Sequence, residues 1–549
     1  MWFHNILRFE CQFHQGAAMW KRRLSYFVYL KYNKIAFPQI TNKIQRVSGM
    51  SKIQKMLMTE TFAVKGKWFL AESEMENSVD GILNYSPQKI ELDLIGSFYD
   101  PFLIQNLNRP QQITIYGFSE QGEWYTLLGC VPSKMHMNAP GFDSISYIVN
   151  WFYVGTRIIQ SETDNIVERA RFSFTNIDAW LKYSVLEVVS KNDHRRTECI
   201  IDMDSPRLDR GSFAIPQIGL SLNEELEYNL EFPKDYFLNE KREINLNRFF
   251  RFVPLSETSC SLKKMADYMH QLRRLLTLLV GTAMYFKYVD FDMGSSQESF
   301  GDEVVEVKNS CRMFFCQVGD IGKTKHLLSR DLRLILLKRE DLQSSMEIIL
   351  NRWYKEQERL GEIINPYVSD LYLPAYMENK FLSIVKGLET YHRFFCKSSD
   401  EGVAQNDNNS NGSTLEADKN KLITYITESI SPQNQEYFVE KICYKSEMNL
   451  RRRLKELFAQ VPESLMSCCF GKLTSDQRNK LFSKIVDTRN YYTHRDKKER
   501  YPNLINSHVE LDHVTKQLSV VLQFFVLAEL GVDENLLAQR LSEKIQNQF

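Results

Sequence analysis

Three side chains suited to RNA chemistry occur together in the stretch VDTRNYYTHRD, residues 486–496: Arg489, Asn490 and His494. Arginine carries a forked, always-charged set of donors that suits phosphate oxygens. Histidine is the side chain best placed to move protons near neutral pH. RNA cleavage needs both functions, because one group must stabilise a pentavalent phosphorane while another deprotonates the 2′-hydroxyl or protonates the leaving oxygen.

The surrounding residues, 474–500, predict a helix that is capped near Ser475. Two apolar rows with a spacing of four lead into the polar residues: Leu481 and Ile485 precede Arg489, and Phe482 and Val486 precede Asn490 and His494. Polar groups on an inward row are costly to desolvate unless they are paired or used. Arg489 and His494 are about 140° apart on an ideal helix, so the arginine must swing back for both to reach one phosphate.

Other residues are candidates for a supporting role. Glu389 lies on a second predicted helix and either orients Arg489 or faces solvent. Tyr491 and Tyr492 either stack on a flipped-out base or pack against a partner helix. His392 is interpreted as a hydrogen-bonded histidine of the helical bundle rather than as a catalyst.

The region around this motif is basic although the chain as a whole is neutral. The chain contains 69 Lys and Arg and 69 Asp and Glu, whereas residues 441–500 contain 15 basic against 7 acidic residues, a net charge of about +8. Such a local field attracts an RNA backbone, although a solvated helix face is the alternative interpretation. The predicted RNA-binding patch consists of Arg451, Arg452, Arg453, Lys455, Arg495, Lys497 and Lys498.

The front part of the chain, from Phe62 to about Ile200, reads as β structure. Short runs rich in β-branched and aromatic residues are separated by turn signals, and Ile90, Leu92 and Leu94 alternate with polar residues. Consecutive hairpins predict an antiparallel sheet or sandwich rather than a nucleotide-binding βαβ fold. Trp68 and Trp124 are assigned to the core, with a sugar- or ligand-binding face as the alternative.

Helical patterns dominate the rest. Apolar residues recur at steps of three and four at Met265, Met269, Leu272, Leu276 and Leu279, and another apolar stripe contains Phe381, Ile384, Val385, Leu388, Tyr391 and Phe395. Residues Ser507 to Glu510 form a capping-box pattern that opens a helix, and Gly531 is placed to end it.

The predicted fold class is therefore α+β and multidomain, with a β-rich front and an all-α bundle behind. The predicted domains are a basic extension at 1–55, a β-rich domain at 56–330, and a helical domain at 331–549 with a disordered loop at 397–418. Met1 and Met50 are alternative starts, because the first 50 residues carry eight Lys and Arg against one acid.

Other features narrow the class of protein. The ten cysteines are scattered, and no Cys and His set has the spacing of a zinc site, which predicts a reduced cytoplasmic protein with no metal and no other cofactor. No apolar run approaches the ~20 residues that span a bilayer. The GDIGKTK segment at 319–325 lacks the first glycine of a phosphate-binding loop.

The chain also resembles a known family. DTRNYYTHRD and FLSIVKGLETYHRFF are similar to the HEPN domain of ApeA-type proteins, and GKWFLAE with GILNYSPQKIELDLIGSF resembles their N-terminal domain. The resemblance implies an anti-phage endoribonuclease that needs no metal and leaves 2′,3′-cyclic phosphate and 5′-hydroxyl ends. Arg489 would stabilise the phosphorane, His494 would transfer protons, and Asn490 would orient the substrate.

The same resemblance implies how the activity is controlled. HEPN nucleases pair two domains, which implies a homodimer through the helical domain. The β-rich domain would sense infection by binding a phage-derived trigger, and the active protein would cut host RNA, with transfer RNA among the candidates. Some HEPN domains only bind RNA or protein, so a catalytically inactive scaffold remains the alternative.

Overall fold

The computed structural model describes most of the chain, and its residues fall into two compact units, Met1–Tyr354 and Lys355–Phe549. The described residues are 7–12, 26–28, 56–98, 112–136, 141–181, 186–190, 196–201, 211–231, 243–256, 259–300, 303–324, 332–373, 375–396, 411–443, 449–495 and 497–548. The division at the end of α6 (Met346–Lys355) places residues 331–354 in the first unit.

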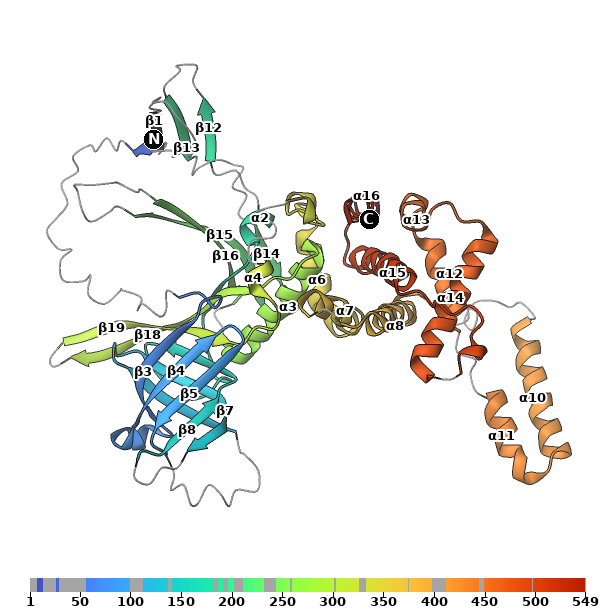
Figure 1. Ribbon diagram of the computed structural model, residues 1–549, viewed down its shortest axis with the longest axis horizontal. Helices are drawn as coiled ribbons and strands as arrows, with labels where there is room; N and C mark the ends of the chain where they lie inside the picture. The colour runs from blue at the N-terminus through green and yellow to red at the C-terminus, as the bar shows by residue number, and fades with distance from the viewer. Residues whose placement is uncertain are drawn as a thin grey trace. The chain divides into compact units, whose positions relative to one another are not determined.

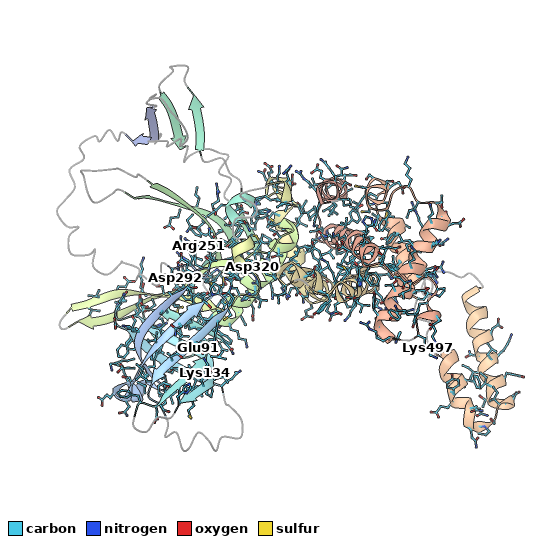
Figure 2. All side chains as sticks on the ribbon, in the orientation of Figure 1. Glu91, Lys134, Arg251, Asp292, Asp320 and Lys497 are labelled. Carbon is cyan, nitrogen blue, oxygen red and sulfur yellow. The ribbon has the colours of Figure 1, made fainter. Side chains whose placement is uncertain are left out.

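Six antiparallel strands of the first unit close into a barrel (Figure 1). They are β3 (Phe62–Phe69), β4 (Val79–Ser86), β5 (Lys89–Ile95), β6 (Ile113–Ser119), β7 (Trp124–His136) and β8 (Ser144–Ile148). Strand β7 closes the barrel because it pairs with β6 along its first half and with β8 along its second half. On the outside, Lys134 Nζ of β7 lies 3.6 Å from Glu91 Oε1 of β5, and Figure 2 labels both residues.

The predicted alternation of β5 is confirmed, because Ile90, Leu92 and Leu94 are buried and the residues between them are not. Trp68 is also fully buried, which confirms its assignment to the core, whereas Trp124 is only partly buried. The sheet is antiparallel as predicted, and its closure into a barrel replaces the sandwich that was the other expectation. Closure pairs every strand of the barrel on both sides and so removes the free edges.

The sheet continues beyond the barrel from the other edge of β7. The order is β9 (Trp151–Gly155), β19 (Glu303–Phe315), β18 (Phe286–Phe300), β11 (Arg169–Phe174), β16 (Glu243–Pro254), β15 (Leu220–Glu231) and β14 (Ser212–Ile215). Helix α3 (Leu262–Val280) has the predicted apolar row, and Met265, Met269, Leu272, Leu276 and Leu279 are all buried.

Smaller elements complete the first unit. A four-stranded sheet contains β1 (Leu7–Gln12), β2 (Tyr26–Val28), β12 (Leu186–Ser190) and β13 (Arg196–Ile201), and β10 (Asn165–Val167) pairs with β17 (Cys260–Ser261). Short helices are η3 (Glu72–Asn77), α2 (Ile177–Trp180), α4 (Ile321–Thr324), η4 (Leu332–Leu334) and η5 (Glu340–Leu342). Most of the predicted basic extension, 1–55, lies outside the described residues.

The second unit is a helical bundle. Its elements are α7 (Gln357–Tyr372), α8 (Met377–Phe395), α10 (Asn411–Ser429), α11 (Pro432–Cys443), α12 (Leu450–Gln460), α13 (Glu463–Phe470), α14 (Ser475–His494), η6 (Lys498–Arg500), α15 (His508–Glu529) and α16 (Glu534–Gln548). Helix α15 packs against α7, α8, α13 and α16, and α8 also packs against α12 and α14. Among the helices that the structure describes, none is both long and apolar enough to span a bilayer.

The ends of two helices follow the sequence signals. Ser507 caps α15 by accepting a hydrogen bond from the Glu510 amide, as predicted, and Gly531 adopts a positive φ of 97° just beyond its end. The Thr474 side chain and Gln477 form a reciprocal capping box at the start of α14.

The prediction of disorder over 397–418 is wrong in part, because α10 already begins at Asn411; residues 397–410 lie outside the described residues. From Leu415 onward the segment contains good helix formers, and α10 packs against α11. Residues 411–418 of the predicted loop are therefore helical.

Helix α16 carries a lysine whose charge is disfavoured. Lys544 Nζ donates a 3.0 Å hydrogen bond to Gln523 Oε1, and desolvation, assisted by the nearby charge of Lys380, lowers the pKa of Lys544 to about 8. Between pH 8 and the ordinary lysine pKa of 10.5, the unfolded chain therefore binds more protons than the folded chain.

We expect the free energy of unfolding of the wild type to rise, relative to that of Lys544→Met, as the pH increases from 8 towards 10.5. Below pH 8 the cost of burying the charge is fully present, so the difference in the free energy of unfolding between the wild type and Lys544→Met does not change with pH there. Denaturant titrations across this pH range measure the effect, and exposed Lys472→Met serves as the control. A difference between wild type and Lys544→Met that does not change with pH would contradict the assignment.

Candidate functional site

The candidate site is built where the end of α14 crosses α8 (Figure 1). The buried face of α14 consists of Phe482, Ile485 and Thr488, which continue the bundle core. Arg489 follows directly after this face, so its stem is partly covered and its guanidinium reaches the surface, with 32% of the side chain exposed.

Arg489 is held by two oxygens. Its Nη1 donates to Asn490 Oδ1 at 3.0 Å, and its Nη2 donates to Glu389 Oε2 at 3.3 Å, although Glu389 lies 100 residues earlier in the sequence. Only 15% of the Glu389 side chain is exposed. The interpretation of Glu389 as a residue that orients Arg489 therefore agrees with the geometry.

A second arginine shares the same carboxylate. Arg393 Nη2 donates to Glu389 Oε1 at 3.1 Å, and 47% of its side chain is exposed. The Glu389 carboxylate thus lies between two guanidinium groups and neutralises part of their charge. Sequence reasoning missed Arg393, although its position four residues after Glu389 on one helix was the signal for this pair.

His494 is placed differently from the prediction. It is the last residue of α14 and is exposed, so it does not lie on an inward row. The reason is that the buried face of α14 is centred on Ile485, and nine residues later His494 lies about 180° away on an ideal helix, which directs it towards solvent. Within the described part of the chain no hydrogen bond joins His494 to Arg489, and the imidazole is unpaired.

The structure therefore brings Arg489, Asn490 and Glu389 into contact and leaves His494 open at the adjoining helix end. Tyr491 and Tyr492 are partly buried, with ring centroids 5.4 Å apart. Burial, together with the nearby carboxylate of Glu378, raises the pKa of the Tyr492 hydroxyl.

His392 belongs to a separate and buried network. Its Nε2 lies 2.9 Å from Glu456 Oε2, and Arg453 Nη1 lies 3.4 Å from its Nδ1. Because arginine can only donate, Nδ1 accepts from Arg453, and the Nε2–H group donates to Glu456 Oε2. This hydrogen bond lowers the pKa of the Glu456 carboxyl. The interpretation of His392 as a bundle histidine agrees with this arrangement.

The same network corrects the predicted RNA-binding patch, because Arg453 is buried, with only 6% of its surface exposed. Helix α12 turns Arg451, Arg452 and Lys455 to the surface and Arg453 towards α8. Arg452 also pairs with Glu456 at 3.2 Å. The exposed cations that follow α14 are Arg495, Lys497 and Lys498, and Figure 2 labels Lys497.

Arg453→Ala is expected to lower the free energy of unfolding by about 1–3 kcal/mol, because it leaves the buried His392 Nδ1 without a donor. Exposed Arg451→Ala, two residues earlier, is expected to leave stability nearly unchanged and to weaken RNA binding. Denaturant unfolding and RNA titration of both variants measure the two effects. If both variants lost the same RNA affinity and Arg453→Ala lost no stability, Arg453 would belong to the RNA-binding patch.

Within the described residues no group of three or more His, Cys, Asp and Glu side chains is arranged to hold a metal ion. The groups that the site offers are two guanidiniums, a carboxylate, an amide and an imidazole. These groups can bind phosphate oxygens and transfer a proton.

Comparison with known protein families agrees with this division of the chain. The family model of ApeA N-terminal domain 1 matches residues 63–353, and the model of the Apea-like HEPN domain matches residues 382–536, which include the whole motif. No curated protein and no solved structure matches the chain. Because the N-terminal model alone covers more than half of the 549 residues, the chain belongs to the ApeA family, with an ApeA N-terminal domain and an ApeA-like HEPN domain.

Proposed function

We propose that the protein is an anti-phage HEPN endoribonuclease that cleaves host RNA, with transfer RNA among the candidate substrates. The observation that carries the proposal is the Arg489 guanidinium, which is oriented by Glu389 and Asn490 beside a histidine that is open to solvent. Arginine has five donors, and two of them are occupied by these oxygens. The other donors can bind the non-bridging oxygens of a phosphate.

The chemistry follows from these groups. The 2′-hydroxyl of the RNA attacks the adjacent phosphorus while a base removes its proton, and the bond to the 5′-oxygen breaks as an acid protonates it. The products are a 2′,3′-cyclic phosphate and a 5′-hydroxyl. Arg489 stabilises the charge that develops on the phosphorane oxygens, and the His494 imidazole accepts or donates the proton. The proposed reaction requires no metal ion.

A homodimer would complete the site. The base and the acid act on opposite sides of the phosphorus, whereas one end of α14 presents one imidazole that has no partner among the described residues. Two copies of α14 that face each other across a cleft supply two histidines and two arginines. We therefore propose that the HEPN domains pair, and that the ApeA N-terminal domain keeps the pair inactive in the cytoplasm until it binds a phage-derived trigger.

The test is to incubate the purified full-length chain with total cellular RNA in the presence of EDTA, with and without lysate from phage-infected cells. We expect new 2′,3′-cyclic phosphate ends in the triggered sample, and end mapping identifies the RNA that is cut. A requirement for added metal would overturn the proposed mechanism.

One observation favours a second candidate function, because Arg489 is engaged by Glu389 rather than directed towards His494. A HEPN domain in this state could serve as a scaffold that binds RNA without cutting it. RNA binding that persists under all triggering conditions, with no new cyclic ends, would support the scaffold instead of the nuclease.

A further inference from the structure

The chain turns back along the motif-bearing helix immediately after α14. Asp487 Oδ2 accepts hydrogen bonds from both the amide and the side-chain Nδ2 of Asn503, each at 3.0 Å. Thr488 Oγ1, on a fully buried residue, accepts a bond from the Ile505 amide at 3.0 Å. These bonds fix the segment 501–505 against the residues that precede Arg489.

This return brings three tyrosine rings and two cations together, which we name the aromatic–cation surface: Tyr491, Tyr492, Arg495, Lys498 and Tyr501. The ring of Tyr491 lies 5.4 Å from that of Tyr492 and 6.0 Å from that of Tyr501. Arg495 Cζ lies 5.3 Å from the centre of the Tyr492 ring, and Lys498 Nζ lies 5.8 Å from that of Tyr491.

The backbone at Arg495 favours this arrangement. Arg495 ends α14 in the left-handed conformation, with φ of 54°, which is uncommon for a residue other than glycine, asparagine or aspartate. Its amide still donates to the Tyr491 carbonyl at 2.7 Å, so the chain reverses while Arg495 stays beside the last helical turn. The three rings are partly buried, whereas Arg495 and Lys498 are exposed.

Such a surface suits a planar group that is attached to a negatively charged polymer. A guanidinium group that stacks on a phenol ring keeps a second planar face, and bases stack on both aromatic rings and arginine planes. Lysines on a plain helix would attract paired and unpaired RNA alike through the phosphates. Rings and guanidinium planes act only on a base that has left the helical stack.

We propose that the aromatic–cation surface binds an unpaired nucleobase adjacent to the phosphate that Arg489 holds, so that the protein prefers single-stranded or looped RNA to duplex RNA. The position of the base relative to the cleaved bond rests on the proposed function. The binding preference itself can be measured without cleavage.

The test measures the affinity of the full-length protein for a fluorescent 2′-O-methyl oligoribonucleotide, in which the attacking hydroxyl is blocked. The probes are the single strand, its blunt duplex and the same strand with abasic positions. For the wild type we expect the tightest binding to the single strand. For Tyr492→Ala we expect about tenfold weaker binding to the single strand and unchanged binding to the duplex and to the abasic strand.

Two milder variants separate stacking from charge and from folding defects. Tyr492→Phe keeps the ring and is expected to bind all three probes like the wild type. Arg495→Lys keeps the charge but loses the plane, and it is expected to weaken single-strand binding selectively. If Tyr492→Ala lost the same affinity for all three probes, the surface would contribute charge alone. If its binding were unchanged but its sedimentation coefficient changed, the tyrosines would line a contact between two copies of the chain. Either result would overturn the proposal.

The failure of this proposal can be distinguished from the failure of the proposed function. If the triggered protein produces no cyclic ends but keeps the preference that Tyr492→Ala removes, the base-binding surface stands and the nuclease proposal falls. If cleavage occurs and Tyr492→Ala binds all probes like the wild type, the nuclease stands and the base-binding surface falls.

Discussion

His494→Ala is expected to lower the rate of RNA cleavage by about 10²- to 10⁴-fold, the usual contribution of a positioned general acid or base. His494 is exposed at the end of α14 and has no hydrogen-bond partner among the described residues, so removing its imidazole disturbs no packing. The loss should therefore appear in catalysis and not in stability. Quantifying 2′,3′-cyclic ends over time, in parallel with denaturant unfolding, measures both quantities.

His508→Ala is the matched control, because His508 is also an exposed histidine at a helix end in the same bundle. This variant is expected to cut RNA at the wild-type rate. Loss of growth inhibition on expression of the His494→Ala protein is the corresponding result in cells. Undiminished cleavage by His494→Ala would remove the imidazole from the mechanism.

Arg489→Lys is expected to lower the rate by about 10²- to 10³-fold although it keeps the positive charge. Lysine cannot donate to Asn490, Glu389 and a phosphate in one plane, as the guanidinium fork can. The single-turnover cleavage rate at saturating protein measures the effect on the chemical step, and RNA titration measures the effect on binding. We expect the rate to fall much more than the affinity.

Arg393→Lys is the control, because Arg393 pairs with the other oxygen of Glu389 and is more exposed. An exposed ion pair contributes little, so this variant should cleave at a rate close to that of the wild type. If Arg393→Lys lost as much activity as Arg489→Lys, the two guanidiniums would act together on the substrate. If both kept full activity, Arg489 would be a structural residue.

The proposed function depends on how Glu389 is released or shared when RNA binds. The carboxylate orients Arg489 but also neutralises it, and a phosphate must compete for the same guanidinium. Because the carboxylate already binds Arg393, a substrate can engage the free donors of Arg489 without leaving Glu389 unpaired. The same carboxylate can therefore position the arginine both before and after the RNA arrives.

The sequence by itself determined the elements that depend on near neighbours in the chain. The periodic apolar rows of α3 and α8, the Ser507 cap of α15 and the alternation in β5 all appear as predicted. The family resemblance could also be read from short motifs. These features are local because helical and strand periods, and capping hydrogen bonds, involve residues within a few positions of one another.

Only the tertiary structure decided which of these residues meet and which face water. Glu389 reaches Arg489 because α8 packs against α14, and Arg453 is buried because α12 turns it towards His392. Likewise, the barrel closes because β3 pairs with β6 and β5 pairs with β8, and the strands of each pair are distant in the sequence. Whether a side chain is buried depends on which other element packs over it. The motif alone therefore could not predict that His494 is exposed or that the Tyr501 ring packs beside that of Tyr491.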